Sequence, residues 1–175
     1  ADADVLRMVA DEAIGPRSNR DELYRSAIVK TIERVPGPEA HALLLAAATD
    51  AHGVVRANAL VSLGNRVAGD PGEREETVAL VLATIERDPE PMTRAFAASV
   101  ASELGVKAAL WPTIRAVRDA RGMAKLANAE AAAAGERALR EMGARAFYAL
   151  SGTTPEQLPF DPAAELSVRD AQVRA

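Results

Sequence analysis

The sequence predicts an all-α protein, an α-solenoid of about four stacked helical hairpins. Three observations lead to this fold class. Apolar residues recur at helical spacing along almost the whole chain, alanine accounts for 39 of 175 residues, and a helix-opening motif repeats. Alanine is the strongest helix former, and its small side chain lets helices pack closely. Alternating apolar and polar runs, which would predict strands, are absent.

About eight main helices are expected, and Gly or Pro marks most of their ends. They cover approximately residues 5–14, 23–35, 38–47, 54–67, 78–88, 92–104, 109–120 and 123–142. Gly143 is expected to end the last of these, before a short helix around 147–150 and a final exposed helix over 163–174. The connections are short, which favours antiparallel neighbours and therefore helical hairpins.

Four helix openings share one spacing, in which a basic residue follows a polar or acidic residue by six positions. The pairs are Asn19 and Arg25, Asp50 and Arg56, Asp88 and Arg94, and Asp119 and Lys125. The bases are 31, 38 and 31 residues apart, a period typical of solenoids. The expected core consists of Ile28, Ile32, Leu60, Leu63, Leu82, Ile85, Ala97, Ala101, Leu104 and Leu139.

This repeat, with small or apolar residues after each base and Leu63-Gly64 and Leu104-Gly105 later in two copies, resembles the HEAT-repeat family of bacterial type over about residues 19–143. The resemblance implies a right-handed, armadillo-like superhelix whose second helices line a concave face. It also implies a ladder of Asp and Arg side chains between neighbouring repeats. Residues 147–152 and 158–162 look like the tail of some bacterial HEAT-like proteins. The expected organisation is a HEAT-like solenoid over 1–150 and a Pro-rich tail over 151–175.

Composition and charge narrow the possible partners. The formal net charge of −4 argues against a nucleic-acid partner, and no apolar run approaches the length needed for membrane insertion. Without cysteine, the chain has no disulfide, thiol catalysis or Cys-based zinc site. The small residues at the N-terminus are compatible with a removed signal peptide, so cytoplasmic and exported or periplasmic locations both stay open. The oligomeric state is not predicted.

Few residues suggest chemistry. His41 and His52 lack neighbouring ligands and are expected at the surface or in caps, so no metal is predicted. The acids Glu73, Glu75 and Glu76 are expected to complement a helix dipole rather than to catalyse a reaction. Trp111 is expected to fill the core or a repeat junction, with anchoring of a partner as the alternative. No catalytic residue and no cofactor is therefore predicted.

The predicted function is a non-enzymatic scaffold that binds a protein or peptide on the concave face. The alternative is a HEAT-like lyase or cofactor-binding protein of the phycobilin lyase type, which visible absorbance of the purified protein would distinguish. DNA binding, as in HEAT-like alkylpurine glycosylases, and a purely structural array are further alternatives.

The predicted binding face consists of positions opposite the core stripe of each second helix. It comprises Lys30, Arg34, Asn58, Val61, Asn65, Phe96, Ser99, Glu103, Leu126 and Glu130. Val61, Phe96 and Leu126 are expected to form an exposed apolar strip with basic residues at one end and acidic residues at the other. Such a strip would suit a helical or extended peptide.

Overall fold

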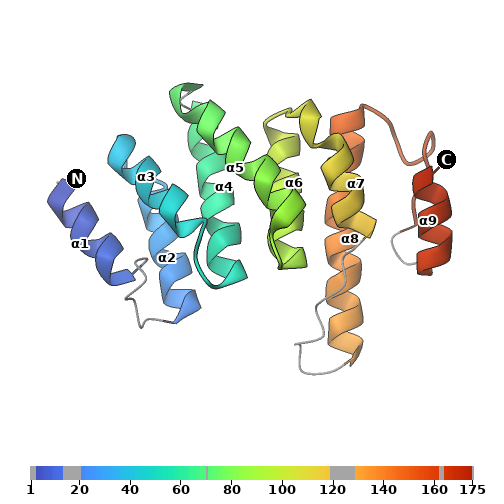
Figure 1. Cartoon of the computed structure of the whole chain (residues 1–175), viewed down its shortest axis with the longest axis horizontal. Coiled ribbons are helices and arrows are strands. Elements are labelled where there is room, and N and C mark those ends of the chain that lie inside the picture. The colour runs from blue at the N-terminus through green and yellow to red at the C-terminus, as the bar shows by residue number, and fades with distance from the viewer. Residues whose placement is uncertain (1–2, 14–20, 70, 119–128, 162–163, 175) are drawn as a thin grey trace. The chain divides into compact units, whose positions relative to one another are not determined.

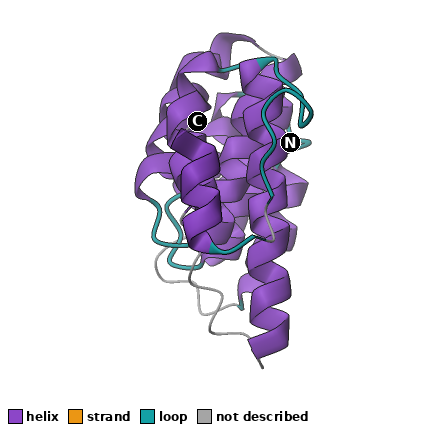
Figure 2. Cartoon of the chain, turned by 90° about the vertical axis from the view of Figure 1, so that its right-hand side faces the viewer, coloured by secondary structure: helices purple, strands orange, loops and turns teal. Residues whose placement is uncertain are grey.

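The computed structural model describes residues 3–13, 21–69, 71–118, 129–161 and 164–174. Within these ranges all regular structure is helical and no strand occurs, as Figure 2 shows. The helices are α1 (Ala3–Ala13), α2 (Glu22–Ile32), α3 (Pro38–Ala47), α4 (Gly53–Gly69), η1 (Pro71–Glu73), α5 (Arg74–Arg87), α6 (Pro91–Glu103), η2 (Lys107–Ala109), α7 (Leu110–Arg118), α8 (Ala129–Ser151) and α9 (Leu166–Arg174). The predicted all-α class is confirmed.

The chain divides into two compact units, Ala1–Leu80 and Val81–Ala175, and the division falls within α5. In the first unit, α2 packs against α3 and α4, and α1 packs against α2 and α3 (Figure 1). In the second unit, α8 packs against α6 and α7, and α9 packs against α7. Within each unit, helices therefore contact both the next helix and the next but one.

Local signals explain where several helices begin and end. The Asp21 side chain accepts a hydrogen bond from the Tyr24 amide at 2.8 Å and so caps the N-terminus of α2. Gly105 has a φ of 66° and follows α6. Its amide donates to the Ser102 carbonyl at 3.1 Å, and the Val106 amide donates to the Ala101 carbonyl at 2.9 Å. These two bonds form the Schellman arrangement, which favours glycine at the left-handed position.

The prediction that Gly143 ends a helix is wrong. α8 continues through it to Ser151 and includes the residues expected to form a separate short helix. Glycine costs about 1 kcal/mol relative to alanine inside a helix. Gly143 is buried, and α8 packs along two other helices, so tertiary packing outweighs this local cost. The expected start of this helix at Met123 lies outside the described residues.

The core of the first unit joins α2, α3 and α4. Its buried members are Val29, Ile32, Ala40, Leu44, Ala47, Ala48, Val55, Ala59 and Leu63. Four are alanines, whose small side chains allow the helix backbones to approach closely. In the second unit, Ala95 of α6 and Leu139 of α8 are buried together, with Met92 and Met142 packed against them.

Seven of the ten predicted core residues are buried. The exceptions are Ile28, Leu82 and Leu104, which are half-buried. Ile28 still packs against the core of the first unit from its edge. The helical period therefore predicted the buried stripe correctly, but it did not predict where the stripe meets solvent.

Candidate functional site

One rung of the predicted Asp and Arg ladder is present in the first unit. Arg25 Nη1 on α2 lies 2.8 Å from Asp50 Oδ2 in the turn before α4. The pair joins the base of the first repeat copy to the acid of the second. Both side chains are buried, with exposed fractions of 9% and 2%. The other Asp50 oxygen, Oδ1, accepts a hydrogen bond from the His52 amide at 2.8 Å, so Asp50 also organises the turn.

The bases of the next two copies hold the turns that precede their own helices. Arg56 Nη1 donates to the Asp50 carbonyl at 2.8 Å, and Arg94 Nη1 donates to the Asp88 carbonyl at 2.7 Å. Asp88 Oδ1 accepts from the Glu90 amide at 2.9 Å, as Asp50 does from His52. In these two copies the base therefore stabilises the turn that opens its own helix, whereas the resemblance implied contacts between neighbouring repeats. Asp119 and Lys125 lie outside the described residues.

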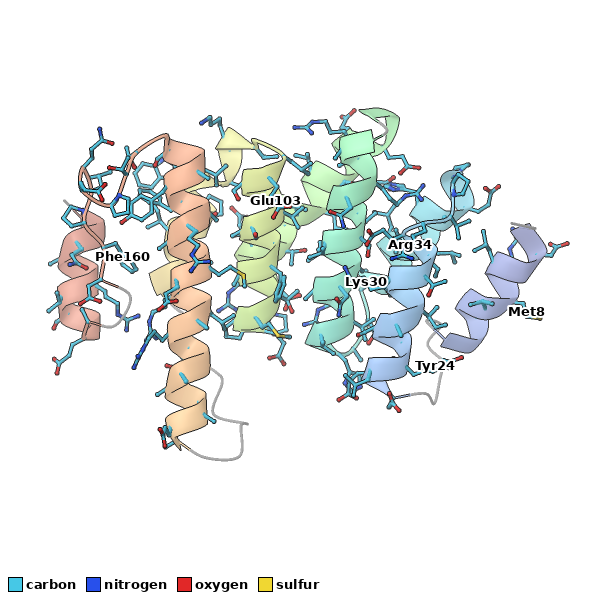
Figure 3. The ribbon with its side chains drawn as sticks, turned by 180° about the vertical axis from the view of Figure 1, so that it is seen from behind. Met8, Tyr24, Lys30, Arg34, Glu103 and Phe160 are labelled. Carbon is cyan, nitrogen blue, oxygen red and sulfur yellow. The ribbon has the colours of Figure 1, made fainter. Side chains whose placement is uncertain are left out.

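In the first unit, the predicted binding residues lie on α2, in the turn after it and on α4, and α2 and α4 pack side by side. Lys30, Arg34 and Asn65 are exposed, whereas Asn58 and Val61 are half-buried. Figure 3 labels Lys30 on α2 and Arg34 in the turn that follows the helix. The Asn58 amide donates to the Val54 carbonyl at 2.9 Å within its own helix. This part of the predicted face is therefore basic on α2 and in the turn after it, and on α4 it consists of Asn58, Val61 and Asn65.

Glu33, which the sequence analysis did not single out, organises this surface. Its Oε2 accepts from Ser62 Oγ at 2.7 Å and its Oε1 from Asn65 Nδ2 at 3.0 Å, while Lys30 Nζ lies 3.6 Å from Oε2. Burial raises the pKa of Glu33. The hydrogen bonds from Ser62 and Asn65 and the charge of Lys30 together lower the pKa by more than burial raises it, so the pKa of Glu33 lies below its ordinary value. The carboxylate links α2 to α4.

We expect Glu33→Gln to destabilise the protein by about 1–2 kcal/mol at neutral pH, because the ionised carboxylate accepts the stronger hydrogen bonds. A folded-state pKa below the unfolded value gives stability that is present above the unfolded pKa and is lost as pH falls through the folded pKa. The stability difference between wild type and variant should therefore shrink below about pH 4.5. Urea unfolding from pH 7 to pH 3 tests this, and a difference that stays constant would contradict it.

In the second unit, a groove runs between α6 and α8. It has a volume of about 530 Å³. Its lining residues are Ser99, Ser102, Ala138, Glu141, Met142, Arg145, Ala146 and Ala149. Ser99 was a predicted binding residue, and its hydroxyl donates to Oε1 of Glu103, another predicted residue, at 3.2 Å. The α8 side of the groove was missed, because the repeat motif falls before α8 and does not reach residues 138–149.

The expected apolar strip is not exposed in the described residues. Val61 in the first unit and Phe96 in the second are both half-buried, and Leu126 lies outside the described residues. Glu130 is exposed in the first turn of α8. The apolar strip therefore stays a prediction, which the described residues do not test.

The expectation that His41 lies at the surface or in a cap is wrong. Its side chain is only 8% exposed, and Nδ1 lies 3.0 Å from Glu73 Oε2 while Nε2 lies 3.6 Å from Glu76 Oε2. Neither ring nitrogen makes an aligned hydrogen bond. Glu73 also pairs with Arg66, whose Nη2 lies 3.0 Å from Oε1. The spacing of these residues in the sequence could not predict this cluster, because the whole of α4 lies between His41 and Glu73 in the chain. His52 is exposed, as expected.

Trp111 is not a core residue, contrary to expectation, because it is 71% exposed. It lines a second cavity of about 280 Å³ in the second unit, formed by α7, α8, α9 and residues 158–160. The lining consists of Leu110, Trp111, Ile114, Ala144, Phe147, Ser151, Leu158, Pro159, Phe160 and Gln172. Five of these lining residues, Ser151, Leu158, Pro159, Phe160 and Gln172, come from the segment expected to form the Pro-rich tail.

In the part of the chain that the structure describes, no three His, Cys, Asp or Glu side chains are arranged to hold a metal ion. No described helix combines the length and apolar character needed to cross a bilayer. No protein-family model matches the sequence, and neither a curated protein nor a solved structure matches it significantly.

Proposed function

We propose that this chain is a non-enzymatic protein-binding module, a right-handed HEAT-like α-solenoid of about four hairpins that holds a polypeptide on the face of its second helices. Two features support the architecture. Alternate helices pack together, α2 with α4 and α6 with α8, as stacked repeats require. The Arg25–Asp50 pair joins the opening motifs of consecutive repeat copies.

The main support for the proposed binding function is the groove between α6 and α8. Glu141 and Arg145 line it one helical turn apart on α8, and neither forms an ion pair within the described ranges. The alanines at 138, 146 and 149 and Met142 supply apolar lining between these charges. A peptide segment presents backbone hydrogen-bond donors and acceptors together with apolar side chains, so such a groove matches its chemistry.

The shape of the groove favours a polypeptide over a compact metabolite. Its α8 side extends from Ala138 to Ala149, which is about 17 Å at the helical rise of 1.5 Å per residue. An extended peptide advances about 3.3 Å per residue, so roughly five residues would cover this length. Arg145 can bind an acidic side chain or a carbonyl of the partner, and Glu141 can accept from a basic side chain or an amide.

We expect Arg145→Ala to weaken binding of a groove-directed peptide by at least about tenfold, because hydrogen bonds to charged groups contribute about 1.5–3 kcal/mol. The peptide comes from panning a random decapeptide display library against the full chain. Its affinity for wild type and variants is then measured by isothermal titration calorimetry.

Arg137→Ala is the matched control, because Arg137 is an exposed arginine on α8 that does not line the groove. It should leave the affinity within about twofold of wild type, since surface substitutions away from a site cost little. Peptides that bind Arg145→Ala and Glu141→Ala as tightly as wild type would contradict the proposal. Helicity and melting temperature, measured for each variant, separate loss of the groove from loss of the fold.

A further inference from the structure

The cavity beside Trp111 has aromatic walls from separate elements. Trp111 comes from α7, Phe147 from α8 and Phe160 from the segment after α8. The chain has only six aromatic residues, so half of them line this one cavity. Figure 3 labels Phe160 near α8 and α9. An exposed tryptophan whose neighbours are apolar and aromatic is typical of a binding site rather than of an isolated surface side chain.

Tyr148 holds the wall formed by residues 158–160. Its hydroxyl donates to the Leu158 carbonyl at 2.8 Å, and its ring packs edge-on against Phe147 with centroids 5.5 Å apart. Burial raises the pKa of Tyr148, the backbone hydrogen bond at Phe160 partly offsets this, and the Glu156 charge raises it again. The hydroxyl therefore keeps its proton at neutral pH and stays a donor. The cavity wall is anchored to α8.

The described lining of the cavity is uncharged, and the side-chain amide of Gln172 supplies a polar group for a ligand. Among the lining residues that the structure describes, none is Asp, Glu, Lys, Arg or His. Ser151 Oγ already bonds to the Tyr148 carbonyl at 3.3 Å and to Thr153 Oγ1 at 2.6 Å. Gln172 Oε1 accepts from the Asp161 amide at 3.1 Å, while its Nε2 has no partner among the described residues. One amide donor therefore remains for a ligand.

We propose that this cavity binds an uncharged aromatic small molecule of about two rings that carries one hydrogen-bond acceptor for Gln172. A dry cavity of about 150 Å³ binds benzene. The present volume of about 280 Å³ is nearly twice as large. Stacking and edge contacts with Trp111, Phe147 and Phe160 select aromatic rings. No described lining residue carries a charge that would compensate the desolvation of an ionised ligand, so the described lining favours an uncharged one. This site faces away from the peptide groove, because residues 144, 147 and 151 lie on the side of α8 opposite residues 138, 145 and 149.

Two probes of nearly the same shape test the charge preference. Because Trp111 is the only tryptophan, its fluorescence reports occupancy of the cavity directly. We expect 2-naphthamide to change this fluorescence saturably and to bind at least tenfold more tightly than 2-naphthoate. Calorimetry with the full chain provides an independent affinity. Failure of 2-naphthamide to bind at millimolar concentration, or equal binding of the carboxylate, would overturn the proposal.

Three variants locate the bound probe. Ala144→Met fills the cavity from α8 and should abolish binding without lowering the melting temperature. Gln172→Leu should weaken 2-naphthamide about fivefold but leave naphthalene unaffected, which also shows that the cavity remains folded. Gln157→Leu replaces the other glutamine, outside the cavity lining, and should change neither affinity. Unchanged binding to Ala144→Met would place the probe elsewhere and overturn the assignment. The affinity of 2-naphthamide for this cavity and the affinity of the peptide for the groove are measured in separate experiments. Either proposal can therefore fail while the other holds.

Discussion

Asp50→Ala is expected to destabilise the protein by about 3–5 kcal/mol, the range found when one partner of a buried ion pair is removed. The substitution would leave the Arg25 guanidinium buried without the carboxylate that now lies 2.8 Å away. It would also remove the hydrogen bond that Asp50 Oδ1 accepts from the His52 amide. Both losses fall on the turn that leads into α4, so the packing of α2 against α4 should weaken.

A double-mutant cycle separates the contribution of the Arg25–Asp50 ion pair from that of the hydrogen bond between Asp50 and the His52 amide. Urea unfolding followed by far-ultraviolet circular dichroism gives the free energy of unfolding for Arg25→Ala, Asp50→Ala and the double variant. The double variant should lose less than the sum of the two single losses, because the second change removes a charge that is already unpaired. Lys30→Ala is the exposed control: the Lys30 side chain is 45% exposed and its Nζ lies 3.6 Å from Glu33 Oε2, so a change of at most about 1 kcal/mol is expected. A loss below about 1 kcal/mol for Asp50→Ala would show that the pair contributes no more than a surface contact.

Leu63→Ala is expected to cost about 2–5 kcal/mol, through lost burial and the cavity left behind. Leu63 is fully buried in the core that joins α2, α3 and α4. Its neighbours there include the alanines at 40, 47 and 59, which are too short to fill the space. The cost should therefore fall in the upper part of this range. The midpoint of urea unfolding measures it.

Leu23→Ala is the matched control for this prediction. It deletes the same atoms from a leucine that is 73% exposed on α2. The expected change lies within about 0.5 kcal/mol, as for surface substitutions away from special features. Similar losses in the two variants would mean that burial of Leu63 does not explain its contribution.

Local patterns predicted the helices and much of their packing. The 3.6-residue period found the stripe that contains Ile32, Leu60 and Leu63, all of them buried. Arg56 follows Asp50 at the fixed spacing of the repeated motif, and it donates to the Asp50 carbonyl. These features follow from interactions between residues a few positions apart, so the sequence contains enough information to predict them.

The sequence by itself determined the all-α class, the positions of most helices and the structural role of the Asp and Arg motif, because each depends on helical period, capping and local hydrogen bonding. Only the tertiary structure decided that His41 is buried beside Glu73, that Trp111 is exposed and that α8 continues through Gly143. It also decided that Phe160 and Gln172 close a cavity against α7 and α8. The physical reason is shared: a residue's period tells which helix face it occupies, whereas burial depends on which distant element covers that face.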